Sequence, residues 1–287
     1  MKEYYSYLDN TPTHAYMKYL YKYPPAPYPY RDLVETNSRR TRKEFEYELL
    51  DTGVFAQDRY FDVLVEYAKE TPEDILVRIT AANRGQEAAE LHLLPTLWFR
   101  NTSASQVAMP VERPEIKEIE GPRGTVLIAA THPTLGVYHA YFEGKVPLLF
   151  TDNETNNART LSEAPERQPK AQGRYQQLRC AGQQSAVNPA QAGAKASAHY
   201  RLKVDPCGSV TVRLRLIDEG SVPQRTGTQA DASLFGAKFD EIPGPAPTGG
   251  RRLLFLDNAP SASEDEARVM RQAGRHAVEQ ATLLLRP

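Results

Sequence analysis

The residues whose type and spacing most clearly suggest a chemical role are tyrosines, which are concentrated at the beginning of the chain. Nine of the sixteen tyrosines lie within residues 4–30, interspersed with prolines. A tyrosine ring can stack on the flat apolar face of a sugar, and its hydroxyl group donates and accepts hydrogen bonds. The same properties suit tyrosine to interfaces between proteins or domains. Four of these residues are candidate contacts for an oligosaccharide or a neighbouring domain: Tyr16, Tyr19, Tyr21 and Tyr23.

A second candidate is the polar stretch "DNETNNARTLSE" at residues 152–163. Its acidic and amide side chains occupy several of the ligand positions of an EF-hand calcium loop. Such a loop needs glycine at its sixth position for a sharp bend, whereas this stretch has Asn157 there. We therefore interpret it as a polar loop without a metal ion. Asp152 and Glu154 remain candidate contacts for substrate or a neighbouring domain.

No catalytic constellation stands out among the remaining residues. The six histidines are scattered, and His92, His139 and His199 fall within strand patterns, where a packed or surface role is expected. The sequence contains no HExxH, no CxxC and no phosphate-binding glycine loop after a strand. No pair of carboxylates can be distinguished, as the acid and base of a glycosidase, from ordinary solvated charges on the surface. We predict no catalytic residue, metal site or cofactor in this chain.

The elements that must position these residues are mostly strands. From residue 45 onward apolar and polar residues alternate, as in half-buried strands. In "RYFDVLVEYA" the inward face should carry Phe61, Val63, Val65 and Tyr67. Other strands are predicted at "FEYELL" (45–50), "DILVRITAANRG" (74–85), "AAELHLLPTLWF" (88–99), "GTVLIAATH" (124–132), "GVYHAYFE" (136–143), "PLLFT" (147–151), "AHYRLKV" (198–204) and "SVTVRLRLID" (209–218), with a hairpin turn at "VDPCGS".

Short strands separated by turns about every 8–12 residues predict a mainly β protein, an antiparallel β-sandwich. Residues 31–44 read as a loop or a short helix. A C-terminal helix should begin at the capping-box sequence Ser263-x-x-Glu266. The predicted domains are a sandwich over 1–218, with a Tyr/Pro-rich opening over 1–44 and an irregular loop over 158–184; an irregular linker over 219–262; and a helix that begins the segment 263–287.

Composition limits the classes of partner. The net charge of −1 and the pI near 6.6 give no basic excess for binding nucleic acid. No apolar run reaches the roughly 18–20 residues that a membrane span needs. The start of the chain lacks the basic and then apolar pattern of a signal peptide. We therefore expect a cytoplasmic protein that contacts neither nucleic acid nor membrane.

Long blocks of the sequence resemble a group of large bacterial proteins related to glycoside hydrolase family 63, which are mannosyl-oligosaccharide glucosidase-like or mannosylglycerate hydrolase-like. The resemblance implies an N-terminal β-sandwich that precedes an (α/α)6 toroid, and it places the acid and base carboxylates of an inverting glycosidase in that toroid. The matching blocks are "KEYYSYLDNTPTHAYMKYLYKYP", "YELLDTGVFAQDRYFDVLVEYAK", "PEDILVRITAANRG", "LHLLPTLWFRNT", "FTDNETNN" and "AVNPAQAGAKASAHYRL".

The resemblance covers residues 2–157 and 185–218, and it fades at 103–110, 158–182 and 244–260 and then recovers. We therefore expect a truncated and frame-damaged relative that lacks the toroid and carries no catalytic residue of the family. The resemblance also implies that the sandwich over 1–218 is incomplete, and that residues 263–287 are a remnant of the first helix of the catalytic domain with a divergent tail. Its expected role is to support the missing (α/α)6 domain, its expected partner, at an oligosaccharide site. Two alternatives stay open: a carbohydrate-binding or interaction module that uses the tyrosine-rich surface, and a small hydrolase that uses acids of the sandwich.

Overall fold

The computed structural model consists mainly of β-strands, which confirms the predicted fold class at this level. The strands pair antiparallel in a large sheet and in a smaller three-stranded sheet. The part of the chain that the structure describes comprises residues 3–11, 13–99, 114–152, 188–222, 234–236 and 239.

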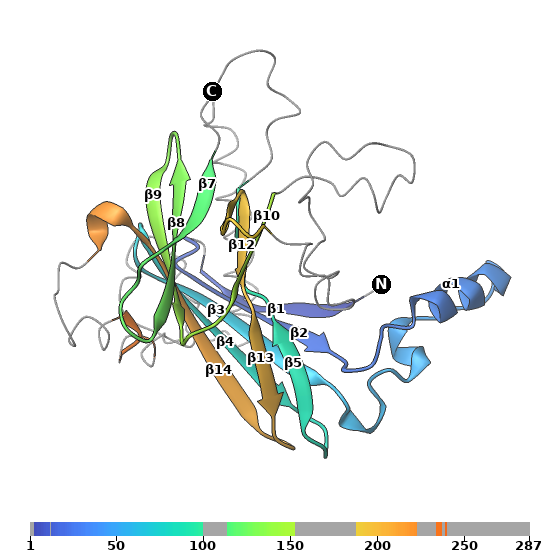
Figure 1. Cartoon of the computed structure of the whole chain (residues 1–287). Coiled ribbons are helices and arrows are strands. Elements are labelled where there is room, and N and C mark those ends of the chain that lie inside the picture. Colours follow the sequence, from blue (N-terminus) through green and yellow to red (C-terminus); the bar gives the residue numbers. More distant parts are fainter. Residues whose placement is uncertain are drawn as a thin grey trace, which may run out of the picture. The chain divides into compact units, whose positions relative to one another are not determined.

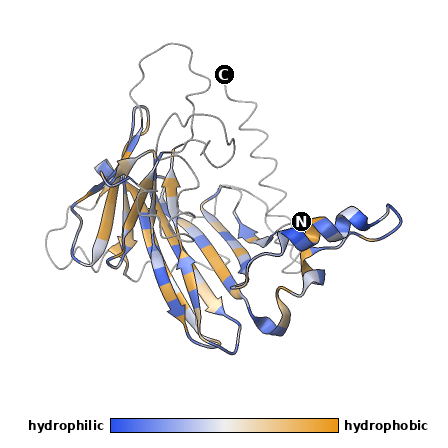
Figure 2. Cartoon of the chain, turned by 45° about the vertical axis from the view of Figure 1, so that its right-hand side comes forward, coloured by the Kyte–Doolittle hydropathy of each residue, from blue (hydrophilic) through white to orange (hydrophobic). Residues whose placement is uncertain are grey.

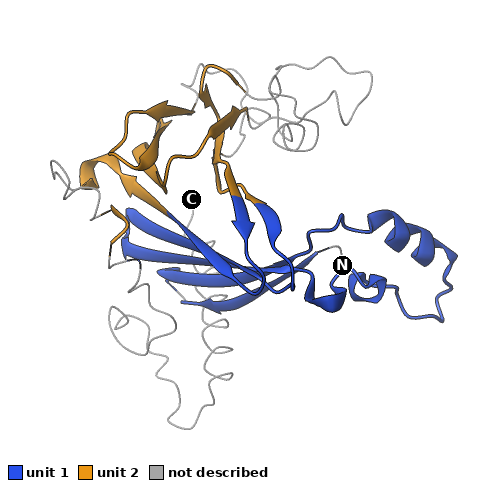
Figure 3. Cartoon of the chain, turned by 60° about the horizontal axis from the view of Figure 1, so that its bottom comes forward, with its two compact units in different colours: residues 1–91, 202–213, 237–287 blue, residues 92–201, 214–236 orange. Residues whose placement is uncertain are grey.

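The chain divides into two compact units, which are coloured separately in Figure 3. Strand β14 (Ser209–Asp218) runs through the boundary, so its first half belongs to unit 1 and its second half to unit 2. Each unit is described by itself below. Unit 1 comprises residues 1–91, 202–213 and 237–287, and unit 2 comprises residues 92–201 and 214–236.

Unit 1 is built on strands in the order β1-β2-β3-β4-β14 (Figure 1). The neighbouring pairs β1/β2, β2/β3 and β3/β4 are antiparallel, and β3 and β4 are the long strands at the centre of this order. The four strands that precede β14 are β1 (Tyr4–Asn10), β2 (Tyr16–Tyr23), β3 (Phe61–Thr71) and β4 (Asp74–Asn83).

The core of unit 1 follows the predicted alternation in part, because Tyr67 of the predicted inward face is half-buried while Glu66 and Ala68 of the opposite face are buried. Phe61, Val63 and Val65 of β3 are buried, and Val63 and Val65 lie opposite the buried Ala81 and Ile79 of β4. The same alternation is visible as bands of hydrophobic and hydrophilic colour along the strands in Figure 2. Burying one large aliphatic or aromatic side chain stabilises the fold by about 1.5–3 kcal/mol. This apolar face therefore anchors the strands that carry the tyrosines.

Unit 2 continues from the second half of β14 in the order β14-β9-β8-β7-β11, and it holds a three-stranded sheet in the order β10-β12-β6. Leu127, Tyr141, Ile217 and Leu234 form a buried cluster in this unit. Strands β5 (Ala89–Leu93) and β13 (Tyr200–Val204) pair with each other, and both cross the boundary between the units. The other bounds are β6 (Thr96–Trp98), β7 (Glu115–Ile119), β8 (Thr125–His132), β9 (Gly136–Glu143), β10 (Leu148–Thr151), β11 (Ala192–Gly193) and β12 (Lys195–Ala198).

Helices are short in the part of the chain that the structure describes. The longest is α1 (Tyr30–Arg39), which confirms a short helix in the segment predicted as loop or helix. None of these helices has the length and apolarity of a membrane span. The three remaining helices are 3-10 turns: η1 (Leu49–Thr52), η2 (Ala56–Asp58) and η4 (Glu219–Ser221).

Three predictions about strands were wrong in detail. Residues 45–50 form no strand, because Glu48 caps a 3-10 turn with Asp51 there. The predicted strand at 88–99 is divided into β5 and β6 by Pro95, whose backbone has no N–H to donate to a ladder. The turn at "VDPCGS" exists, but it is no hairpin because β13 and β14 belong to different sheets.

Several predictions fall on residues outside the described part of the chain. These are the irregular loop 158–184 and the C-terminal helix that was expected from Ser263. The predicted linker 219–262 is described at a few positions only, and two of them are informative. Leu234 and Phe239 are buried, so this stretch contributes apolar side chains to the core of unit 2 and of unit 1, respectively.

Candidate functional site

Strands β1 and β2 place most of the N-terminal tyrosines on one face. Tyr5 lies opposite Tyr21 and Tyr7 lies opposite Tyr19 in the antiparallel register, so these four side chains point to the same side. A bulge between Tyr7 and Asp9 then shifts the register. We call the whole group the tyrosine surface; it comprises Tyr5, Tyr7, Tyr19, Tyr21, Tyr23, Tyr28, Tyr30 and Tyr67.

One row of rings in the tyrosine surface crosses three strands. The ring centroids of Tyr7 and Tyr19 are 6.4 Å apart. Those of Tyr19 and Tyr67 are also 6.4 Å apart, with ring planes tilted by 20°. Both distances lie within the range in which aromatic rings attract each other. Contacts of this kind hold the rings of β1, β2 and β3 in a fixed array, in which Tyr19 is the middle member.

A second row leads from β2 to the start of α1. The centroid distances are 6.1 Å for Tyr21–Tyr23, 6.4 Å for Tyr23–Tyr28 and 5.5 Å for the stacked pair Tyr28–Tyr30. The Glu3 carboxylate accepts hydrogen bonds from the Tyr21 hydroxyl at 3.0 Å and the Tyr30 hydroxyl at 2.9 Å. The hydroxyls of Tyr21 and Tyr28 are 3.1 Å apart. These hydroxyl groups are thus occupied by partners within the chain.

The electrostatic environment keeps these phenols neutral. Burial and the neighbouring Tyr67 raise the pKa of Tyr19 to about 12. Partial burial and the hydrogen bond to Glu3 raise the pKa of Tyr30 to about 12. Burial, the Tyr28 hydroxyl and the Glu3 carboxylate also raise the pKa of Tyr21. Tyr19, Tyr21 and Tyr30 therefore offer uncharged aromatic rings over the whole physiological range of pH.

The most accessible part of the tyrosine surface lies on β1. The side chains of Tyr5 and Tyr7 are 62% and 63% exposed, respectively, whereas Tyr19, Tyr21 and Tyr23 are half-buried. Tyr5 and Tyr7 are two residues apart on one strand and face the same side. An array of this kind can contact a flat apolar partner over several rings at once. β1 therefore provides the part of the surface that a partner can reach.

Tyr16, the fourth predicted contact, lies apart from the other three. It is buried, and its hydroxyl donates to Glu66 Oε1 at 2.9 Å. The other Glu66 oxygen accepts from Arg78 Nε at 2.8 Å, and Lys18 Nζ lies 3.7 Å from Oε1. Burial alone would raise the pKa of Glu66, but the hydrogen bonds from Arg78 and Tyr16 outweigh it and hold the pKa below its usual value. The role of Tyr16 here is to position a buried carboxylate.

This buried network is a feature that the sequence reasoning missed. Glu66 and Arg78 lie directly opposite each other on β3 and β4. Their charges are on the polar face of the predicted alternation, so a prediction of strand register would have paired them. A second missed contact joins His92 and His199 in unit 2, where Nδ1 and Nε2 are 2.9 Å apart. At this distance the N–H of one imidazole donates a hydrogen bond to the ring nitrogen of the other, and no signal in the sequence joins residues so far apart.

The two acidic candidates are less informative. Asp152 is half-buried directly after β10 in unit 2, and Glu154 lies outside the described residues. Tyr19, Tyr21 and Tyr23 belong to unit 1, whereas Asp152 belongs to unit 2. Within the described ranges, no three His, Cys, Asp or Glu side chains converge as a metal site would require.

Comparison with known proteins finds a similar chain in Saccharomyces cerevisiae, an uncharacterized protein that is 34% identical over 251 residues. The match covers 76% of this chain and 23% of the yeast protein. The chain thus spans less than a quarter of the length of this relative. No family model matches the sequence.

Proposed function

We propose that this chain is a non-catalytic β-sandwich part of a large, glucosidase-like glycoside hydrolase that acts on oligosaccharides in the cytoplasm. Support comes from the ordered sequence blocks that resemble the family 63 group, several of which fall on strands of the structure, including β1 to β4. The length of the yeast relative is also in keeping with a chain that forms one part of a larger protein.

The observation that carries the proposal is the state of the hydroxyl groups on the tyrosine surface. Tyr21 and Tyr30 donate to Glu3, and Tyr28 donates to the carbonyl of Lys22 at 3.2 Å. A glycan is recognised by hydrogen bonds to its many hydroxyl groups as well as by stacking. Tyrosines whose hydroxyls are occupied, as those of Tyr21, Tyr28 and Tyr30 are, offer mainly ring faces and edges, which suit an apolar protein face. The proposed partner is therefore the helical (α/α)6 domain.

A second function is favoured by one specific observation. Tyr5 and Tyr7 are strongly exposed on the same face of β1. Two accessible rings spaced along a strand could stack on successive sugar units of an oligosaccharide. In this alternative the chain is a carbohydrate-binding module whose contact is limited to β1.

Binding measurements distinguish the two functions. The remainder of the yeast relative, expressed without the segment aligned to this chain, serves as the protein probe, and a series of gluco- and manno-oligosaccharides serves as the glycan probe. We expect the chain to bind the protein probe, and we expect Tyr5→Ala with Tyr7→Ala to weaken that binding at least tenfold, because central aromatic residues carry much of an interface's affinity. We expect no hydrolysis of the oligosaccharides by the chain alone.

The control is Leu135→Ala, which removes a comparably exposed apolar side chain from unit 2. Binding of an oligosaccharide that is lost in the double tyrosine variant, without binding of the protein probe, would replace the first function with the second. Glucosidase activity of the purified chain would contradict both and would establish a small hydrolase.

A further inference from the structure

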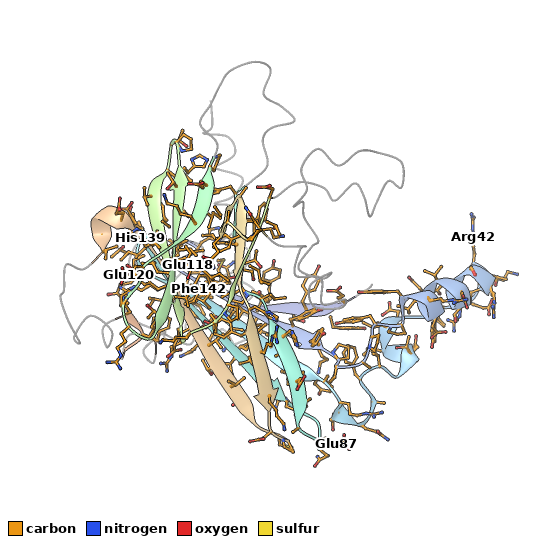
Figure 4. All side chains as sticks on the ribbon, in the orientation of Figure 1. Arg42, Glu87, Glu118, Glu120, His139 and Phe142 are labelled. Carbon is orange, nitrogen blue, oxygen red and sulfur yellow. The ribbon has the colours of Figure 1, made fainter. Side chains whose placement is uncertain are left out.

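The three-stranded sheet of unit 2 carries a row of unlike side chains on one face. In the register of β10, β12 and β6, Thr151 lies opposite Lys195, which in turn lies opposite Trp98, so these three side chains point to the same side. We call them the tryptophan row. Phe150 and Ala196, one position along their strands, point to the other side and are buried in the core. Strands β10 and β12 are labelled in Figure 1, and Figure 4 shows the side chains in the same view.

Trp98 is the open end of the row. It is the single tryptophan of the chain, and its side chain is 54% exposed at the end of β6, the outer strand of this sheet. An indole ring offers a flat apolar face together with one N–H donor. Trp98 can therefore stack on a flat apolar group of a ligand.

Thr151 is the closed end of the row. Its side chain is 1% exposed, and within the part of the chain that the structure describes its hydroxyl has no hydrogen-bond partner. The backbone of β11 packs directly beside it, because a Cβ at Gly193 would lie 2.5 Å from the Thr151 carbonyl oxygen. A buried hydroxyl without a partner destabilises the free chain. A ligand that supplies a hydroxyl group would satisfy it.

Lys195 stands between these two ends. Its side chain is half-buried, and burial lowers the pKa of its ammonium group. A partly desolvated ammonium gains from oxygen atoms that accept its hydrogen bonds. Its four-carbon stem is flexible, so a ligand that engages the ammonium can draw the stem aside and reach the Thr151 hydroxyl.

The spacing of these groups suits a sugar. Neighbouring strands lie about 4.8 Å apart, so the row extends over roughly 10 Å from Trp98 to Thr151. A hexose presents an apolar C–H face for the ring and several hydroxyl groups at its rim for the ammonium and the hydroxyl. The hydroxyls of Tyr21 and Tyr30 are occupied within the chain, whereas that of Thr151 is available. The same criterion thus favours protein at the tyrosine surface and sugar at the tryptophan row.

We propose that the tryptophan row is a sugar-binding subsite that holds one or two units of an oligosaccharide. Trp98 stacks on the apolar face of a hexose, Lys195 donates to its hydroxyl oxygens, and the Thr151 hydroxyl pairs with a further hydroxyl. The class of ligand rests on the proposed function. The subsite adds to that function a direct contact between this chain and the oligosaccharide, separate from the tyrosine surface.

The fluorescence of the single tryptophan tests the subsite in the whole chain. Titration with gluco- and manno-oligosaccharides should shift the emission of Trp98 to shorter wavelength with a dissociation constant on the order of 1 mM, because the contact is small. Lys195→Met should weaken binding about tenfold, since it removes a charged donor. Thr96→Val is the matched control: Thr96 lies on the same face of β6, but its hydroxyl already donates to the Leu94 carbonyl, so binding should not change.

Thr151→Val gives the sharper test. It replaces the unpartnered hydroxyl with a methyl group of similar size, so it should raise the midpoint of urea denaturation and yet weaken sugar binding about threefold or more. Gain of stability with loss of binding is a signature that a purely structural threonine would not give. A variant with unchanged sugar binding would contradict the role of Thr151.

Three results would overturn the subsite as a whole. The first is no response of Trp98 to any of the oligosaccharides up to about 50 mM, a concentration at which even very weak binding is visible. The second is a response to the remainder of the yeast relative alone. The third is a response to adenosine as strong as the response to sugar. The proposed function is tested by a different measurement, binding to that protein probe and its dependence on Tyr5 and Tyr7, so the two failures can be told apart.

Discussion

The Tyr21 hydroxyl has two hydrogen-bond partners within the chain. It donates to Glu3 and lies within hydrogen-bond distance of the Tyr28 hydroxyl. We expect Tyr21→Phe to lower the free energy of unfolding by about 1 kcal/mol, the net value of a typical hydrogen bond. Urea denaturation would measure this change. Tyr5→Phe is the matched control, because the described part of the chain offers the exposed Tyr5 hydroxyl no such bond; equal effects of the two variants would contradict the network.

Glu66 predicts a dependence of stability on acidic pH. Its pKa is lower in the folded chain than in the unfolded chain, so its charge stabilises the fold at pH values above the unfolded pKa, and that contribution is lost as the pH falls through the folded pKa. Glu66→Gln should destabilise the chain by about 3 kcal/mol near pH 7, because it leaves the Arg78 charge without its buried partner. The difference between the variant and the wild type should shrink in acid; a constant difference down to pH 3 would show that the carboxylate charge is unimportant.

Tyr19 predicts the opposite behaviour in alkali. Its pKa of about 12 in the folded chain exceeds the usual value of 10.0, so the folded chain keeps a proton that the unfolded chain loses between these values. The contribution is fully present below pH 10 and is lost as the pH rises toward 12. Stability measured between pH 9 and pH 12 should fall less steeply in Tyr19→Phe than in the wild type. If the stability of both chains falls equally steeply with pH, the Tyr19 hydroxyl is exposed to solvent in the folded chain.

Residues 30–52, which run along α1, turn and return to η1, make a prediction of their own as an element. Trypsin can cleave after Arg39, Arg40, Arg42 and Lys43 in this turn, and the hydrogen bonds between Asn37 and Tyr47 hold the turn closed. We expect Asn37→Ala to accelerate cleavage after residues 39–43 about tenfold, since proteolysis follows local opening. Thr36→Ala removes an exposed side-chain bond one residue earlier and should change the rate little. Equal cleavage of all three chains would mean that Asn37 does not fix the turn.

The strands illustrate which elements the sequence predicts well. β9 and β14 coincide with their predicted bounds, and β3 buries Phe61, Val63 and Val65 as expected, because a two-residue period is unambiguous when one face is buried. The stretch 45–50 has a similar alternation but forms no strand. It is held against α1 by the hydrogen bonds between Asn37 and Tyr47, and no local pattern reveals that it lacks a strand partner.

The candidate site likewise combines features that the local sequence predicts with features that depend on the fold. The spacing in β2 is sufficient to place Tyr19, Tyr21 and Tyr23 on one side and Tyr16 on the other. Tyr67 joins the tyrosine surface because β2 pairs with β3. Glu3 reaches Tyr21 because β1 pairs with β2. Such contacts join residues far apart in the sequence, so they require the fold. The same applies to the pair His92 and His199, which are 107 residues apart.

For the whole molecule, the central claim is that the tyrosine surface is a contact for protein and not for glycan. Hydrogen–deuterium exchange of the chain, alone and with the remainder of the yeast relative as the protein probe, tests it most directly. The account predicts slower exchange in β1 and β2 when the protein probe is bound, and unchanged exchange there with oligosaccharides. Protection of β1 and β2 by an oligosaccharide, or protein binding that leaves both strands unprotected, would contradict it.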